Sequence, residues 1–122
     1  MAVSPEFRAF VEDQIGRVAP VRSRRMFGGL GLYSGDLFFG VVDDDLVYFK
    51  VDDATRPRYV KRRMKPFDPM GSPMNGYWQV PPDVIEDADE LASWVDEALG
   101  VAERAGKKPK RRKRTAKKKE GR

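Results

Sequence analysis

The sequence predicts an α+β fold of two layers, in which helices pack an antiparallel sheet of about five strands. Strand-like segments alternate with tight-turn residues between residues 26 and 57, and an amphipathic helical segment lies near each end. At 122 residues, the chain is long enough for one hydrophobic core. We therefore expect one folded domain, residues 1–106, followed by a charged tail, residues 107–122.

The first predicted element is a helix from about residue 5 to residue 18, ending before Pro20. Ser4 is a preferred N-cap residue, and Pro5 follows it at the first helical position, where proline is tolerated. Apolar residues then recur at helical spacing: Phe7, Phe10, Val11, Ile15 and Val18.

Three strands are predicted next, as an antiparallel meander. Residues 26–33 and 37–42 carry strand-like composition and are separated by Ser34-Gly35-Asp36. Asp43-Asp44-Asp45 then reverses the chain, because short polar side chains tolerate turn conformations. Leu46-Val47-Tyr48-Phe49 follows as the third strand.

The second half of the domain contains two helices and two strands. Asp52, Asp53 or Thr55 can cap a helix that has Pro57 in its first turn. Proline, glycine and methionine between residues 65 and 77 predict a short strand near Phe67, a loop, and another strand over residues 76–80.

The last helix is predicted to begin at a capping box formed by Asp87 and Glu90. Its apolar stripe should pack on the sheet and close the core. The stripe contains Leu91, Trp94, Val95, Ala98, Leu99 and Ala102.

Several short motifs occur together in these elements. They are Met26-Phe27-Gly28-Gly29, Gly31, Tyr33, Tyr48-Phe49-Lys50-Val51-Asp52, Phe67 and Tyr77-Trp78 with Val80-Pro81. Through them, the chain from about residue 5 to residue 105 resembles the N-terminal domain of the TfoX/Sxy family, bacterial proteins linked to competence regulation. The resemblance implies the element order α-β-β-β-α-β-β-α and an accessory or regulatory role, but no established chemical activity. Members that include the competence regulators commonly carry a second, C-terminal helical domain, and we expect this chain to lack it.

Missing residue types exclude most familiar catalytic sites. With 0 Cys and 0 His, the chain has no disulfide, thiolate nucleophile, Cys/His zinc site or imidazole base. Gly28-Gly29-Leu30-Gly31 lacks the spacing of a dinucleotide fingerprint, and Asp43-Asp44-Asp45 fits a solvated turn better than a calcium loop. We therefore expect no enzymatic activity, no cofactor and no bound metal.

The tail differs sharply from the domain in charge. Residues 107–122 contain 11 of the 24 Lys and Arg residues and one Glu, so the tail carries +10 and the rest of the chain −5. Because it has no large apolar side chain, we expect it to be disordered in isolation and to bind DNA or RNA through phosphate contacts. The predicted binding residues are Lys107, Lys108, Lys110, Arg111, Arg112, Lys113, Arg114, Lys117, Lys118 and Lys119. Two alternatives stay open: a solvated terminus that aids solubility, and contact with an acidic membrane surface without insertion.

A second set of cations lies inside the domain. They either extend a phosphate-binding surface or pair with nearby acids, and we prefer the second hypothesis slightly. The candidates for an auxiliary basic surface are Arg22, Arg24, Arg25, Arg58, Lys61, Arg62 and Arg63, with Arg56 and Lys65 beside them.

Aromatic residues of the strands allow two interpretations. Phe27, Phe38, Phe39, Tyr48 and Phe49 either stack on single-stranded bases or fill the core, and core packing is favoured because alternation sends at least half of them inward. Tyr77 and Trp78 should face opposite sides of their strand for the same reason.

Two functional hypotheses follow. The first is an accessory protein that binds nucleic acid without sequence preference through its tail and contacts a protein partner through its domain. The second is a protein-interaction or chaperone-like adaptor, because the predicted strand order is similar to that of small dimeric secretion-chaperone folds. The chain has no long apolar stretch and no signal peptide, so we expect a cytoplasmic protein, with nucleoid association and homodimer formation left open.

Overall fold

A computed structural model describes residues 3–26 and 28–107, and it confirms the α+β fold and the expected element order. The described helices are α1 (Pro5–Gly16), α2 (Arg56–Lys61), α3 (Pro82–Ile85) and α4 (Ala88–Lys107). The described strands are β1 (Arg22–Met26), β2 (Gly29–Ser34), β3 (Leu37–Asp43), β4 (Leu46–Lys50), β5 (Pro66–Phe67) and β6 (Met74–Gln79).

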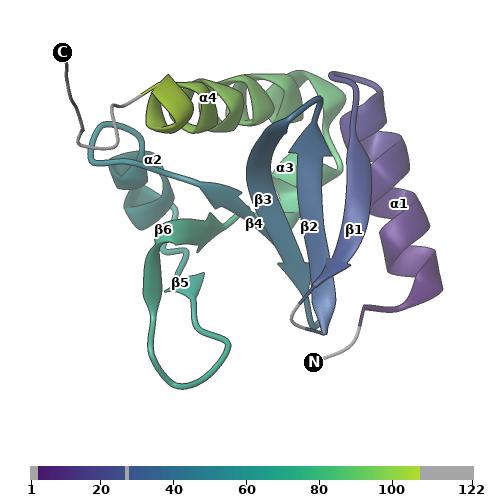
Figure 1. Ribbon diagram of the computed structural model, residues 1–122, viewed down its shortest axis with the longest axis horizontal. Helices are drawn as coiled ribbons and strands as arrows, with labels where there is room; N and C mark the ends of the chain where they lie inside the picture. Colours follow the sequence, from purple (N-terminus) through teal and green to yellow (C-terminus); the bar gives the residue numbers. More distant parts are fainter. Residues whose placement is uncertain (1–2, 27, 108–122) are drawn as a thin grey trace, which may run out of the picture.

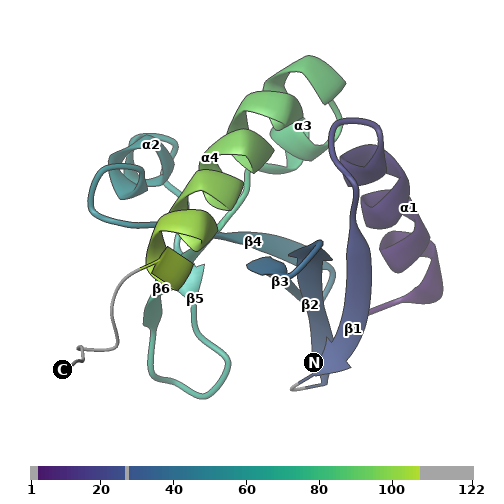
Figure 2. The same cartoon turned by 45° about the horizontal axis from the view of Figure 1, so that its top comes forward.

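The strands form one antiparallel sheet in the order β1-β2-β3-β4-β6-β5. In Figure 1, α3 lies behind β2 and β3, α4 runs across the top of the sheet, and α1 flanks β1. Both Figure 1 and Figure 2 place α2 next to α4, on the opposite side of the molecule from β1 and α1.

The sheet has six strands in the described residues instead of about five, because β1 precedes the first predicted strand. Arg22, Arg24 and Arg25 therefore lie within a strand and not before it, as the sequence had suggested. Their segment shows no apolar alternation, so its strand character comes from pairing with β2 along its whole length, from Arg22 opposite Tyr33 to Met26 opposite Gly29. An edge strand of this kind is held by backbone hydrogen bonds more than by packing.

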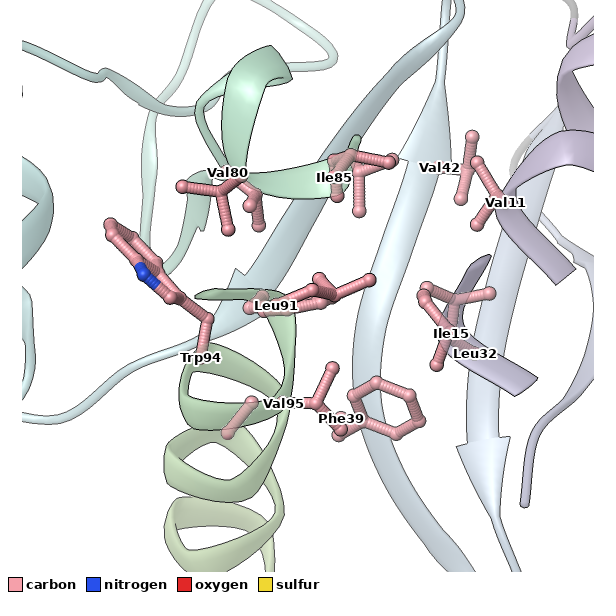
Figure 3. Packing of buried hydrophobic residues seen from close by; sticks show 14 of the residues in the cluster. Val11, Ile15, Leu32, Phe39, Val42, Val80, Ile85, Leu91, Trp94 and Val95 are labelled. Atoms are coloured by element: carbon pink, nitrogen blue, oxygen red, sulfur yellow. The ribbon is translucent and has the colours of Figure 1, made fainter. Parts of the chain in front are cut away.

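The hydrophobic core lies between the sheet and the helices. Leu32, Phe39 and Phe49 point from the sheet into this space, and each is fully buried. Figure 3 shows Val11 of α1 beside Val42 and Ile15 beside Leu32, with Val95 of α4 next to Phe39. The apolar stripes of α1 and α4, both predicted from the sequence, therefore close the core against the sheet.

Local capping contacts agree with two of the predicted helix starts. Ser4 Oγ accepts a hydrogen bond from the Phe7 backbone N–H at 3.1 Å. Asp87 Oδ1 accepts from the backbone N–H groups of Asp89 and Glu90 at 3.1 and 3.3 Å. Each cap satisfies donors that the first helical turn leaves without a partner.

The start of α2 is organised by Asp52 although Thr55 occupies the N-cap position. Asp52 Oδ1 accepts from the backbone N–H groups of Ala54 and Thr55 at 3.1 and 3.0 Å, and the Thr55 hydroxyl accepts from the Asp52 N–H at 3.1 Å. The turn between β4 and α2 is therefore fixed by a reciprocal pair of side chains.

The three-aspartate segment forms the predicted turn. Asp44 and Asp45 adopt left-handed backbone conformations with φ of 54° and 56°, and both are exposed. Asp45 Oδ1 also accepts a hydrogen bond from the Ser4 N–H at 2.9 Å, which ties this hairpin to the start of α1. None of the helices in the described residues combines the length and apolar composition that crossing a bilayer requires.

Candidate functional site

The candidate site lies on the sheet face opposite the core. Strand side chains alternate between faces, so the neighbours of buried core residues point away from the helices. Phe39 is buried in the core, whereas Phe38 lies half-buried on the other face; Trp78 packs against the core, whereas Tyr77 faces away. The prediction that Tyr77 and Trp78 face opposite sides is confirmed.

Five residues form a continuous row on this face, which we call the aromatic band: Arg22, Tyr33, Phe38, Tyr77 and Lys50. The ring centroids of Tyr33 and Phe38 lie 5.1 Å apart, and those of Phe38 and Tyr77 lie 5.8 Å apart. The rings come from β2, β3 and β6, and the pairing of β4 with β6 places Lys50 opposite Tyr77.

A cation lies at each end of the aromatic band. The Arg22 guanidinium is 4.7 Å from the centroid of the Tyr33 ring, and its Nη2 donates to the Gly35 carbonyl at 3.3 Å. Lys50 Nζ is 4.9 Å from the centroid of the Tyr77 ring and donates to the Tyr77 hydroxyl at 3.2 Å. Attraction between a cation and the face of an aromatic ring holds both charges close to the rings.

Gly31 leaves room for two side chains that pack on this face of the sheet. A Cβ at this position would lie 2.7 Å from Met26 Cε and 2.9 Å from Phe38 Cε1. Met26 and Phe38 therefore lie over the β2 backbone where a side chain would otherwise stand. The absence of a side chain at Gly31 therefore has a packing role.

The other end of the same face is acidic. Tyr48 packs against Phe67 with ring centroids 4.8 Å apart. Burial raises the Tyr48 pKa above its ordinary value, and the nearby carboxylates of Asp43, Asp44 and Asp68 raise it further. The face is therefore electrically divided, with cations beside the aromatic band and carboxylates around Tyr48.

The structure separates the two groups of predicted auxiliary cations. Arg22, Arg24 and Arg25 lie on β1 at one edge of the sheet, and by register Arg24 shares the outer face with Arg22. Arg58, Lys61, Arg62 and Arg63 lie on or just after α2, at the other side of the molecule in Figure 1. The two groups do not meet in one surface.

The group near α2 is largely engaged in ion pairs. Arg58 lies 2.9 Å from Glu97 and stacks over the Trp94 ring at 4.3 Å, and Arg62 lies 2.8 Å from Asp83. Pairing with nearby acids, the preferred hypothesis, therefore describes Arg58 and Arg62. Lys61 and Arg63 are exposed and form no ion pair within the part of the chain that the structure describes.

The predicted tail contacts fall almost entirely outside the described residues. The backbone of Lys107 ends α4, and residues 108–122, with nine of the predicted binding residues, are not described. Arg104, three residues before that end, pairs with Asp52 in the turn before α2 at 2.9 Å. The tail therefore begins beside α2 and not beside β1.

Sequence reasoning missed Tyr33 and Tyr77 as members of one surface. It considered Phe38 and Tyr48 for base stacking together with Phe39 and Phe49, which the structure buries in the core; Phe27 lies outside the described residues. The favoured prediction of core packing is thus confirmed for Phe39 and Phe49. The available signal was strand alternation, which puts Tyr33, Phe38 and Tyr77 at positions opposite to core residues.

Among the described residues, no three Asp or Glu side chains gather closely enough to hold a metal ion. Asp52 has a lowered pKa, chiefly because Arg104 hydrogen-bonds to it, and that ion pair has an evident structural role.

Comparison with known proteins identifies the family of this chain. The search of curated proteins finds no match to this chain. The family model for the TfoX N-terminal domain matches residues 13–102, which span all but the first turns of α1, the end of α4 and the tail. On the strength of that match, together with the α+β fold, the chain belongs to the TfoX N-terminal domain family.

Proposed function

We propose that this protein is a non-enzymatic accessory regulator that binds nucleic acid through residues 107–122 and contacts a protein partner through its folded domain. Membership of the TfoX N-terminal domain family suggests a regulatory, competence-related role. The observation that carries the nucleic-acid part is the separation of charge, with +10 in the tail against −5 in the rest of the chain. We propose a cytoplasmic location with association to the nucleoid.

The charge separation favours binding by the tail over binding by the domain near α2. Two cations on or just after α2 are already paired, Arg58 with Glu97 of α4 and Arg62 with Asp83 of α3. Each phosphate that a free tail cation neutralises releases condensed counterions, and this entropy gain requires no particular base sequence. The expected affinity for duplex DNA is therefore strong at low salt and independent of sequence.

The test compares the wild-type chain with a full-length variant in which the Lys and Arg residues of 107–122 are changed to Gln. We expect the neutralised variant to lose most of its affinity for duplex DNA at about 50 mM salt, where phosphate contacts are strong. A variant carrying Lys61→Gln and Arg63→Gln is the matched control, because it removes exposed domain cations and leaves the tail intact. Unchanged duplex affinity in the neutralised variant would contradict the proposal.

One structural feature supports the adaptor hypothesis. β1 is an edge strand, and an edge strand offers backbone groups to which a partner strand can add. Arg22, Arg24 and Arg25 on β1 favour an acidic partner strand over a second copy of β1, since two copies would bring like charges together. If the variant with the neutralised tail still captures a protein partner but no longer binds DNA, the two activities belong to different parts of the chain.

A further inference from the structure

We propose that the aromatic band is a stacking surface for the bases of single-stranded nucleic acid. The inference rests on the proposed function and extends it, because it adds base contacts by the domain to phosphate contacts by the tail. The tail alone does not distinguish a single strand from a duplex. The aromatic band would make that distinction, since only unpaired bases have faces free to stack on protein rings.

Three features of the rings fit this role. Tyr33, Phe38 and Tyr77 come from different strands of one sheet and form an unbroken row, with neighbouring centroids 5.1 and 5.8 Å apart. All three are only half-buried, in contrast to the fully buried Phe39 and Phe49 of the core. A sheet that displays aromatic rings on an uncovered face is a known way of binding single strands, because every base has a π face.

The charges around the aromatic band favour a polyanion as the occupant. Arg22 and Lys50 hold positive charge at its two ends, each close to a ring, and Arg24 shares the face by register. A nucleotide that stacks on these rings would place its phosphates near cations. The rings and charges together match the combination of stacking platform and positive groove found in proteins that bind single strands.

The acidic end of the same face limits where a strand can lie. Tyr48 and Phe67 also form a ring pair, but Asp43, Asp44 and Asp68 act electrostatically on Tyr48. Phosphates would be repelled there. Tyr48 is thus a half-buried ring on the same face in opposite electrostatic surroundings, whereas Phe67 is buried, and Tyr48 is therefore an internal control for the proposal.

The experiment measures binding of the full-length chain to a labelled oligothymidine of about a dozen nucleotides, and to a duplex of the same length. The test variant carries Tyr33→Leu and Tyr77→Leu, changes that remove the rings and keep apolar side chains on the sheet. We expect the single-strand affinity to fall roughly tenfold for each ring that contacts a base, with duplex affinity unchanged. The Tyr48→Leu control should bind both ligands like the wild type.

The outcomes separate the two proposals. Wild-type single-strand affinity in the Tyr33→Leu, Tyr77→Leu variant overturns the aromatic band as a binding surface, and so does an equal loss in Tyr48→Leu. The tail proposal fails instead if neutralising the tail leaves duplex affinity unchanged, whatever the ring variants do.

A second measurement on the wild-type chain keeps the test valid if a ring variant does not fold. Ultraviolet crosslinking to a bromouracil-substituted single strand, followed by mass spectrometry, should label peptides containing Tyr33, Phe38 or Tyr77. Crosslinks to tail residues alone would contradict the proposal.

Discussion

Arg104 donates a hydrogen bond to Asp52, with 2.9 Å between its Nη2 and the carboxylate Oδ2. Asp52 lies in the turn before α2 and Arg104 near the end of α4, so this contact joins two residues that are 52 positions apart in sequence. The Arg104 hydrogen bond lowers the Asp52 pKa, and the backbone N–H groups of Thr55 and Ala54 act in the same direction.

The pH dependence of this contact gives the first prediction. A carboxylate whose pKa is lowered by folding stabilises the native state above its unfolded pKa, and that contribution is lost as pH falls through the folded pKa. Arg104→Ala should therefore reduce the free energy of unfolding at pH 7 by less than about 1 kcal/mol, since both side chains are partly exposed. The difference from wild type should be smaller at about pH 3, below the ordinary aspartate pKa of about 3.9, and should disappear only below the lowered pKa of folded Asp52.

Urea unfolding of both proteins at the two pH values measures this difference. Arg17→Ala serves as a control, because Arg17 follows the last residue of α1, pairs at 3.0 Å with Asp13 of the same helix and connects no separate elements. A destabilisation by Arg104→Ala that is equally large at both pH values would show that the ion pair is not its source.

Two strand glycines should differ in their tolerance of alanine. A Cβ on Gly40 would lie 2.8 Å from the Tyr48 backbone oxygen, which cannot move without disturbing the pairing of β3 with β4. A Cβ on Gly31 would meet the ends of the Met26 and Phe38 side chains, which can rotate away. Gly40→Ala should destabilise the fold by about 1–3 kcal/mol and Gly31→Ala by less, as measured by chemical denaturation. Equal losses would mean that the side chains over Gly31 are as rigid as backbone.

The elements that sequence predicted correctly are those with local signals. Ser4 and Asp87 sit at their helix starts because a cap bonds to backbone within the next turn. β1 was missed because Arg22, Ser23, Arg24 and Arg25 carry no alternation, and their strand conformation depends on β2.

The candidate site depends on information that local patterns do not contain. Alternation places Phe38 and Tyr77 away from the core, but only the pairing of β6 with β4 brings them together across the sheet. Which face the helices leave uncovered is likewise a property of the whole fold. Residues separated in sequence therefore formed a surface that no single motif indicated.

Trp94 should make a large contribution to stability. Its side chain is 2% exposed and meets the Tyr59 ring edge-on with centroids 4.8 Å apart. Trp94→Ala should lower the free energy of unfolding by about 3–5 kcal/mol, because it leaves a cavity between α2 and α4. Trp94→Phe should be much milder, since the indole Nε1 has no hydrogen-bond partner among the described residues to lose. Equilibrium denaturation of both variants checks the order, and a larger loss in Trp94→Phe than in Trp94→Ala would contradict it.

The last prediction concerns how the tail recognises nucleic acid. If residues 107–122 act by neutralising phosphates, the number of cations matters and their order does not. A full-length variant with the same tail residues in shuffled order should therefore bind duplex DNA like the wild type at every salt concentration. Changing Lys110, Lys113 and Lys118 to Gln should instead flatten the slope of log affinity against log salt by about 0.9 for each contact removed. Salt titrations of the dissociation constant measure both variants, and a shuffled tail that loses binding while keeping its charge would show that the tail contains an ordered motif.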